Sequence, residues 1–224
     1  MAKKRSKIIK DLIMNKIDVL QAIQSLDFIL EDIKDKKIKK WVQMEIDGYK
    51  NENEVPNYRR VNTILIGDIQ IGYNLYNHVN IPFVDKEAFD FFSKYIILEP
   101  VSVIEQYALA EKENEHHSLS LDANLAIVNK YQTSNGEVIR AHRELSLFAY
   151  NNVLSILKDK LLNIFKLLED KYGNLDEMYI DFSDKQVERE VSEKINNIIY
   201  TDKSIHIGDG NTLKSSNVGD NNEN

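Results

Sequence analysis

Apolar residues recur at helical spacing through most of the first fifty positions. Between residues 20 and 33 they occur every three or four positions, which places them along one side of a helix. Asp18 precedes this stripe and Asp35 precedes the next one, and an aspartate in that place accepts hydrogen bonds from the first free backbone N–H groups of a helix. Gly48 follows the second stripe, and glycine commonly ends helices. We therefore predict one helix after Asp18 and another at residues 36–47.

The pattern changes at residues 61–72, where β-branched residues are frequent and Gly67-Asp68 lies in the middle. Such a stretch forms either two short strands joined by a tight turn or one bulged strand. We expect a loop through Pro82 and then a short helix near residues 85–95. A further helix should begin at Pro100, because proline is tolerated in the first helical turn.

The second half of the chain holds the clearest periodicity. Apolar residues follow a three-four alternation across residues 146–171, which predicts a long core helix, with a helix at an oligomer interface as the alternative. Before it, residues 119–131 suit a helix and residues 137–144 suit a strand. After it, residues 175–182 suit a short strand, and Asp184 suits the cap of a final helix.

Together these elements predict an α+β fold. We expect a mainly helical domain with a small antiparallel sheet built from residues 60–72 and 137–144. The domain is expected to span residues 1–182, followed by a connecting amphipathic helix at residues 183–203. Residues 204–224 form a tail rich in glycine and asparagine.

This tail contains a short repeat. The motif Ile-Gly-Asp-Gly-Asn at residues 207–211 recurs as Val-Gly-Asp-Asn-Asn at residues 218–222. A disordered polar terminus is one interpretation. The other is a strand–turn–strand arch whose copies stack between chains through asparagine ladders, giving an amyloid-like oligomerisation segment. The positions that this arch would use are Ile205, Ile207, Gly208, Asp209, Asn211, Leu213, Val218, Gly219, Asp220 and Asn222.

The amino-acid composition excludes several kinds of functional site. The chain of 224 residues contains no cysteine, which excludes disulfides, cysteine nucleophiles and thiolate metal sites and is typical of a reducing compartment. No stretch suits a signal peptide or a membrane span, so we expect a cytoplasmic protein with no membrane partner. Residues 1–40 are basic, whereas the whole chain has a net charge of −7. The basic segment suits a solvated helix face or a contact with nucleic acid, but the acidic chain disfavours a nucleic-acid platform.

Three basic residues are candidates for phosphate binding. Arg140 and His142 share a face if residues 137–144 form a strand, and Arg143 lies beside them. A solvent-facing edge strand explains the same residues without a ligand. His116-His117 is not expected to bind a metal, because adjacent side chains point apart in a helix or a strand. No glycine-rich phosphate loop or nucleophile elbow occurs, and we expect no cofactor and no metal.

Several segments resemble a known family. Trp-Val-Gln-Met-Glu-Ile-Asp-Gly-Tyr at residues 41–49 is followed by Pro-Asn-Tyr-Arg at residues 56–59. Leu-Glu-Pro-Val-Ser-Val-Ile-Glu at residues 98–105 and Tyr-Gly-Asn-Leu-Asp-Glu at residues 172–177 come next. Together they are similar to blocks of the AbiTii family and cover roughly residues 6–182. The resemblance implies a role in abortive infection, a bacterial response against phage, and supplies no enzymatic activity.

The first of these segments also suits a structural role. Trp41 and Tyr49 lie about two helical turns apart, so both can face the same neighbour. Glu45 lies between them and can accept a hydrogen bond from Arg59, forming an ion pair that sets how the chain leaves the helix. A structural tie and a ligand or partner site both remain open. The candidate residues for either are Trp41, Glu45, Gly48, Tyr49, Pro56, Tyr58 and Arg59.

These observations favour a defence protein without a recognisable catalytic centre. We expect a sensor or effector that associates with itself or with another defence protein. The alternative is a toxin-like enzyme that acts on nucleic acid through Arg140, His142 and Arg143. Whether the protein is an enzyme stays open, and a non-enzymatic role is favoured.

Overall fold

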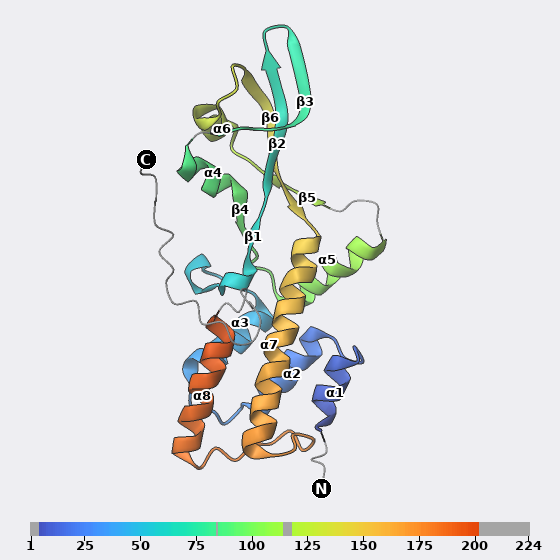
Figure 1. Ribbon diagram of the computed structural model, residues 1–224, viewed down its shortest axis with the longest axis vertical. Helices are drawn as coiled ribbons and strands as arrows, with labels where there is room; N and C mark the ends of the chain where they lie inside the picture. The colour runs from blue at the N-terminus through green and yellow to red at the C-terminus, as the bar shows by residue number, and fades with distance from the viewer. Residues whose placement is uncertain (1–4, 84, 114–117, 202–224) are drawn as a thin grey trace, which may run out of the picture.

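The computed structural model describes residues 5–83, 85–113 and 118–201. A helical body forms one end of the molecule, and a distal sheet extends from it (Figure 1). The helical body consists of α1 (Lys7–Ile13), α2 (Val19–Ile29), α3 (Lys36–Asp47), α5 (Val101–Glu113), α7 (Phe148–Tyr172) and α8 (Lys185–Tyr200). The distal sheet consists of β2 (Ile64–Ile71), β3 (Asn74–Asn80), β5 (Ser118–Asp122) and β6 (Glu137–Ser146), with α4 (Lys86–Ser93) and α6 (Leu125–Tyr131) beside it. Between the two lie the short 3-10 helices η1 (Glu52–Glu54) and η2 (Asn57–Arg59) and a ribbon of β1 (Arg60–Asn62) and β4 (Lys94–Ile96).

The predicted helix caps are present. Asp18 accepts a hydrogen bond from the backbone N–H of Gln21, whose side chain in turn accepts one from the backbone N–H of Asp18. Asp35 accepts from two backbone N–H groups at the start of α3, and Asp184 does the same for α8. Each cap satisfies donors that have no partner within the helix, so it fixes where the helix begins.

The long helix α7 runs through the middle of the helical body. It packs against α1, α2, α5 and α8, and Leu157, Leu161 and Phe165 on it are fully buried. The interpretation of this segment as a core helix is therefore confirmed. The final helix adds side chains to the same core, namely Val191, Ile195 and Ile199. Within the described part of the chain, no helix combines the length and the apolar character needed to cross a membrane.

Neighbouring strands of the distal sheet are antiparallel and follow the order β3-β2-β6-β5. One side of this sheet forms a second, smaller core with α4 and α6, which is made of Leu65, Ile69, Ile81, Phe92, Val128 and Val138. The predicted α+β fold, mainly helical with a small antiparallel sheet, is confirmed.

Residues 61–72 do not form the predicted pair of short strands joined by a turn at Gly67-Asp68. β2 is one continuous strand, and the turn lies at Gly72-Tyr73 and not at Gly67-Asp68. The extra residue at each register shift lies on its partners β3 and β6, so the bulges predicted for this strand occur on its neighbours. Gly72 has a φ of 60°, which suits the first position of a two-residue hairpin turn. Residues 74–80, expected in a loop, form β3. This strand is rich in asparagine, so pairing with β2 and not intrinsic strand propensity explains it.

Two other expected elements are also wrong. Residues 118–122 form β5, which limits the helix predicted across residues 119–131 to α6. Residues 175–182 form no strand. Their apolar side chains cover the helical core instead, so these side chains are buried without a strand partner. The buried ones are Leu175, Ile180 and Phe182.

Two buried carboxylates tie distant segments to the helical body. Glu169 in α7 accepts hydrogen bonds from the backbone N–H and the hydroxyl of Ser6, at 2.5 and 2.7 Å, and pairs with Arg5 at 2.6 Å. Glu188 in α8 accepts from the backbone N–H of Lys34 at 2.7 Å and from Lys185 Nζ at 3.0 Å. Burial by itself raises the pKa of each carboxyl, but these donors outweigh it and lower both pKa values.

The protein should therefore lose stability in acid. A carboxyl whose folded pKa is lowered contributes its full stability above its unfolded pKa, about 4.3, and this contribution disappears as the pH falls through the folded pKa. The double variant Glu169→Gln/Glu188→Gln should be less stable than the wild type at neutral pH. It should also lose less of its stability between about pH 5 and pH 3. Urea unfolding across this range measures both effects, and an unchanged pH dependence in the variant would contradict the assignment.

Candidate functional site

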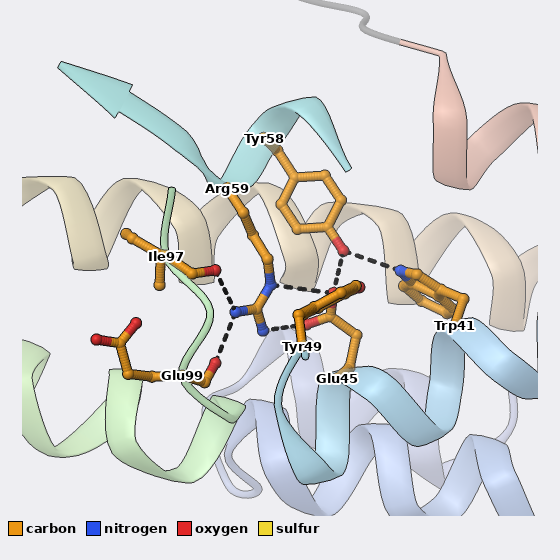
Figure 2. A network of polar contacts seen from close by, with 7 residues as sticks. All are labelled: Trp41, Glu45, Tyr49, Tyr58, Arg59, Ile97 and Glu99. Carbon is orange, nitrogen blue, oxygen red and sulfur yellow. Dashed lines mark hydrogen bonds and ion pairs between the residues drawn. The ribbon is translucent and has the colours of Figure 1, made fainter. Parts of the chain in front are cut away.

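The first family-like segment forms a buried polar network around Glu45 (Figure 2). Arg59 donates from Nη2 to Glu45 Oε2 at 2.5 Å and from Nε to Glu45 Oε1 at 3.2 Å. Both side chains of this ion pair are fully buried. The predicted pair is therefore present, and its two-point geometry is the strong form of a carboxylate–guanidinium contact.

Aromatic side chains complete the hydrogen bonding of Glu45. The hydroxyls of Tyr49 and Tyr58 donate to Glu45 Oε1 at 2.6 and 2.5 Å, and Trp41 Nε1 donates to the Tyr58 hydroxyl at 2.9 Å. Burial and the adjacent carboxylate both raise the pKa of each tyrosine, so the two hydroxyls stay protonated and remain donors. Burial acts to lower the pKa of Arg59, but Glu45 outweighs it and the net pKa is raised. The network therefore contains one charge of each sign, each satisfied by several partners.

The same network joins the family-like segments at residues 41–49 and 56–59 to the one at residues 98–105. Arg59 Nη1 donates to the carbonyl oxygens of Ile97 and Glu99, at 3.2 and 2.7 Å (Figure 2). The backbone N–H of Tyr49 donates to the carbonyl of Leu98 at 2.8 Å. Gly48 makes this approach possible, because it has a φ of 88° and a Cβ there would lie 3.0 Å from the Leu98 carbonyl oxygen.

Burial favours the structural interpretation of this segment. The side chains of Trp41, Glu45, Tyr49, Tyr58 and Arg59 are all buried, as is Pro56, while Gly48 is half-buried. A partner could reach these groups only if the helices around them separated. The burial of these side chains therefore favours a structural tie over a ligand or partner site at this segment.

Lys160 connects this network to the end of the last helix. Its ammonium group lies 5.3 Å from the centre of the Tyr58 ring and donates to the carbonyl oxygens of Ile198 at 2.6 Å and Thr201 at 3.4 Å. A cation at the carboxyl end of a helix is favourable, because unpaired carbonyl groups point there. The end of α8 is thus anchored next to the family-like segment, immediately before residue 202.

The basic residues of β6 are divided between the two sides of the sheet. Arg140 and His142 share one side, as predicted, whereas Arg143 lies on the other and stacks over the Tyr95 ring at 5.8 Å. Arg140 Nε pairs with Asp68 Oδ2 at 2.9 Å. β6 is an interior strand between β2 and β5, so the expectation of an edge strand is wrong. The arrangement does not gather the three residues around one phosphate.

His142 has two neighbours that the sequence did not predict. His142 Nε2 lies 3.3 Å from Glu144 Oε1, and His78 of β3 lies close to both. No local pattern links His78 with His142, because β3 and β6 are far apart in the chain. The two strands come near each other only in the sheet, where β2 lies between them. The only available signal was the alternation of His142 and Glu144 along one strand.

The tip of the β2–β3 hairpin exposes apolar side chains. This hairpin tip, residues 71–76, projects beyond the rest of the distal sheet (Figure 1). β3 is an edge strand of the described sheet, and it pairs there with β2 alone. The tip contains no charged residue, so it lacks the lysines that commonly protect an edge from association. Its exposed side chains are Ile71, Tyr73, Leu75 and Tyr76.

Two predicted regions lie outside the described residues. They are the pair His116-His117 and the whole glycine- and asparagine-rich tail at residues 204–224. The interpretations of the tail as a disordered terminus or as an oligomerisation arch therefore stay predictions.

Comparison with known proteins identifies one family. The family model described as AbiTii matches residues 6–193. The match includes the segments that carry the buried network, and it ends within α8. No curated protein and no solved structure matches the chain.

Proposed function

The chain belongs to the AbiTii family, and we propose that it carries out its part in defence against phage by associating with further copies of itself. The family name refers to abortive infection. Association is the mechanism that the surface supports best, and the candidate contact is the hairpin tip, residues 71–76. The tail at residues 204–224 is the second proposed element of assembly.

The exposed hairpin tip carries this proposal. Apolar side chains at an edge strand lose contact with water when they meet a partner, and the free backbone groups of the edge can pair with a second strand. Each copy would present the same uncharged tip, so two tips can meet without repulsion between like charges. The bulge in β3 limits this pairing to the part of the strand next to the turn. The contact is accordingly small and benefits from a second one in the tail.

The alternative, a toxin-like enzyme that acts on nucleic acid, has less support. Its proposed residues Arg140, His142 and Arg143 do not converge, and Arg140 is paired with Asp68. A phosphate would have to displace that carboxylate. The charge of the whole chain, −7, also opposes binding of a polyanion.

Charging the hairpin tip should weaken protection. The double variant Tyr73→Lys/Leu75→Lys places positive charges on both copies at the contact, so the tips repel one another. Both side chains are exposed, and the fold should therefore remain stable. Cells that express this variant should allow more plaques in a phage challenge than cells that express the wild type. The matched control is Phe28→Lys/Tyr179→Lys, which charges two exposed side chains of the helical body and should protect normally.

A crosslink tests whether the partner is a second copy. The chain has no cysteine, so Tyr73→Cys introduces a single thiol at the hairpin tip. Mild oxidation should yield disulfide-linked dimers, and Tyr179→Cys should yield far fewer. Normal protection by the lysine variant would refute the hairpin contact. Loss of protection without crosslinked dimers would point to another defence protein as the partner.

A further inference from the structure

Side chains from two separate strands bring metal-binding atoms together on the distal sheet. His142 and Glu144 alternate along β6, so both project from the same side of the sheet. His78 comes from β3, and β2 lies between these two strands (Figure 1). One nitrogen or oxygen atom from each of the three residues lies within 4.8 Å of the other two.

The spacing of these atoms suits a metal ion. Glu144 Oε1 lies 3.3 Å from His142 Nε2 and 3.8 Å from His78 Nε2. Ligand atoms bound to a tetrahedral zinc ion at about 2.0–2.1 Å lie roughly 3.3 Å from one another. Glu144 is close enough to pair with either ring, but a metal ion would bind both imidazoles and the carboxylate through these same atoms.

Irregular strand pairing brings His78 within reach. Both β3 and β6 change register with β2 around the Asp68–Ile69 step, and such bulges redirect side chains. His78 also has a φ of 52°, a left-handed conformation that costs energy in a residue other than glycine. Asp68 stabilises it, because its Oδ1 accepts a hydrogen bond from the backbone N–H of His78 at 3.0 Å.

From this geometry we infer that His78, His142 and Glu144 form a binding site for a divalent transition metal ion of the zinc class. Imidazole nitrogens combined with one carboxylate favour such an ion over magnesium or calcium, which prefer oxygen ligands throughout. Three protein ligands leave a position for water or another ligand. The side chains of His142 and Glu144 are about one-third exposed or less, and that of His78 is mostly exposed, so an ion can reach them from solvent.

Charges around the three ligands are compatible with a cation. Arg140 projects from the same side of β6, and Asp68 pairs with it at 2.9 Å. Asp122 of β5 lies opposite His142 in the strand register and adds a further negative charge. The site is separate from the hairpin tip, so it goes beyond the proposed association and can be tested independently.

Titration of the full-length protein with Zn²⁺ or Co²⁺ alone tests the site. Calorimetry should show one ion bound per chain, and the visible absorption of bound Co²⁺ should indicate nitrogen and oxygen ligands. His78→Ala and His142→Ala should each weaken metal binding by about 100-fold or more. Even the loss of a residue that only hydrogen-bonds a metal ligand lowers metal affinity by about 10–100-fold. Glu144→Gln, which preserves shape, should also weaken it.

The double variant His116→Ala/His117→Ala is the matched control and should bind the ion as the wild type does. Circular dichroism shows whether each variant is folded, and Glu144→Gln decides the matter if an alanine variant is not. Absence of saturable binding by the wild type would overturn the inference. So would wild-type affinity in Glu144→Gln and the folded histidine variants, or loss of binding in the control.

Discussion

Replacing Arg59 with methionine should lower the free energy of unfolding by about 3–5 kcal/mol, because it leaves the Glu45 carboxylate buried without its counter-charge. The side chains of both residues are fully buried. The substitution also removes the donor that serves the carbonyl groups of Ile97 and Glu99. An unsatisfied buried polar group costs free energy, and here several are left at once. Urea unfolding followed by circular dichroism measures the loss.

A second substitution separates the charge from the shape. In the variant Glu45→Met/Arg59→Met both charges are gone, so the double variant should be less destabilised than the sum of the two single variants. The surface pair of Lys40 and Glu54 provides a control, since Lys40→Met should change stability by about 1 kcal/mol or less. An Arg59→Met protein as stable as the Lys40→Met protein would show that the buried pair does not hold the segment together.

Deletion of residues 204–224 should abolish protection against phage while the rest of the chain still folds. The contacts that hold α8 lie before the deletion, because Val191, Ile195 and Ile199 form its core face. Lys160 binds the end of that helix at Ile198 and Thr201. If copies of the tail repeat stack, its loss removes one of the two proposed contacts and leaves only the small hairpin contact. Plaque counts measure protection, and sedimentation measures the size of the purified protein.

The matched comparison keeps the tail and removes two basic residues that the alternative function, an enzyme acting on nucleic acid, would use. Arg140→Ala/Arg143→Ala should protect as the wild type does if association is the mechanism. Full protection without residues 204–224 would refute the role of the tail. Loss of protection in a folded Arg140→Ala/Arg143→Ala variant would favour the enzyme that acts on nucleic acid.

Features that depend on neighbouring residues could be predicted from the sequence alone. The caps at Asp18, Asp35 and Asp184 act within one helical turn, and the apolar spacing of α7 follows from helix geometry. The Glu45–Arg59 pair was also predictable, since a short loop returns one residue towards the other. Both helix spacing and loop length are properties of consecutive residues.

Features that depend on which strands meet could only be decided by the tertiary structure. β3 has an asparagine-rich sequence that favours a loop, and pairing with β2 makes it a strand. The burial of the family-like segment, which favours a structural role for it, depends on segments around residues 97–99 and on α7. His78 reaches His142 and Glu144 only because β2 places their strands in one sheet and the strands bulge there. A sequence pattern records distance along the chain, whereas a binding site depends on distance through space, and folding alone relates the two.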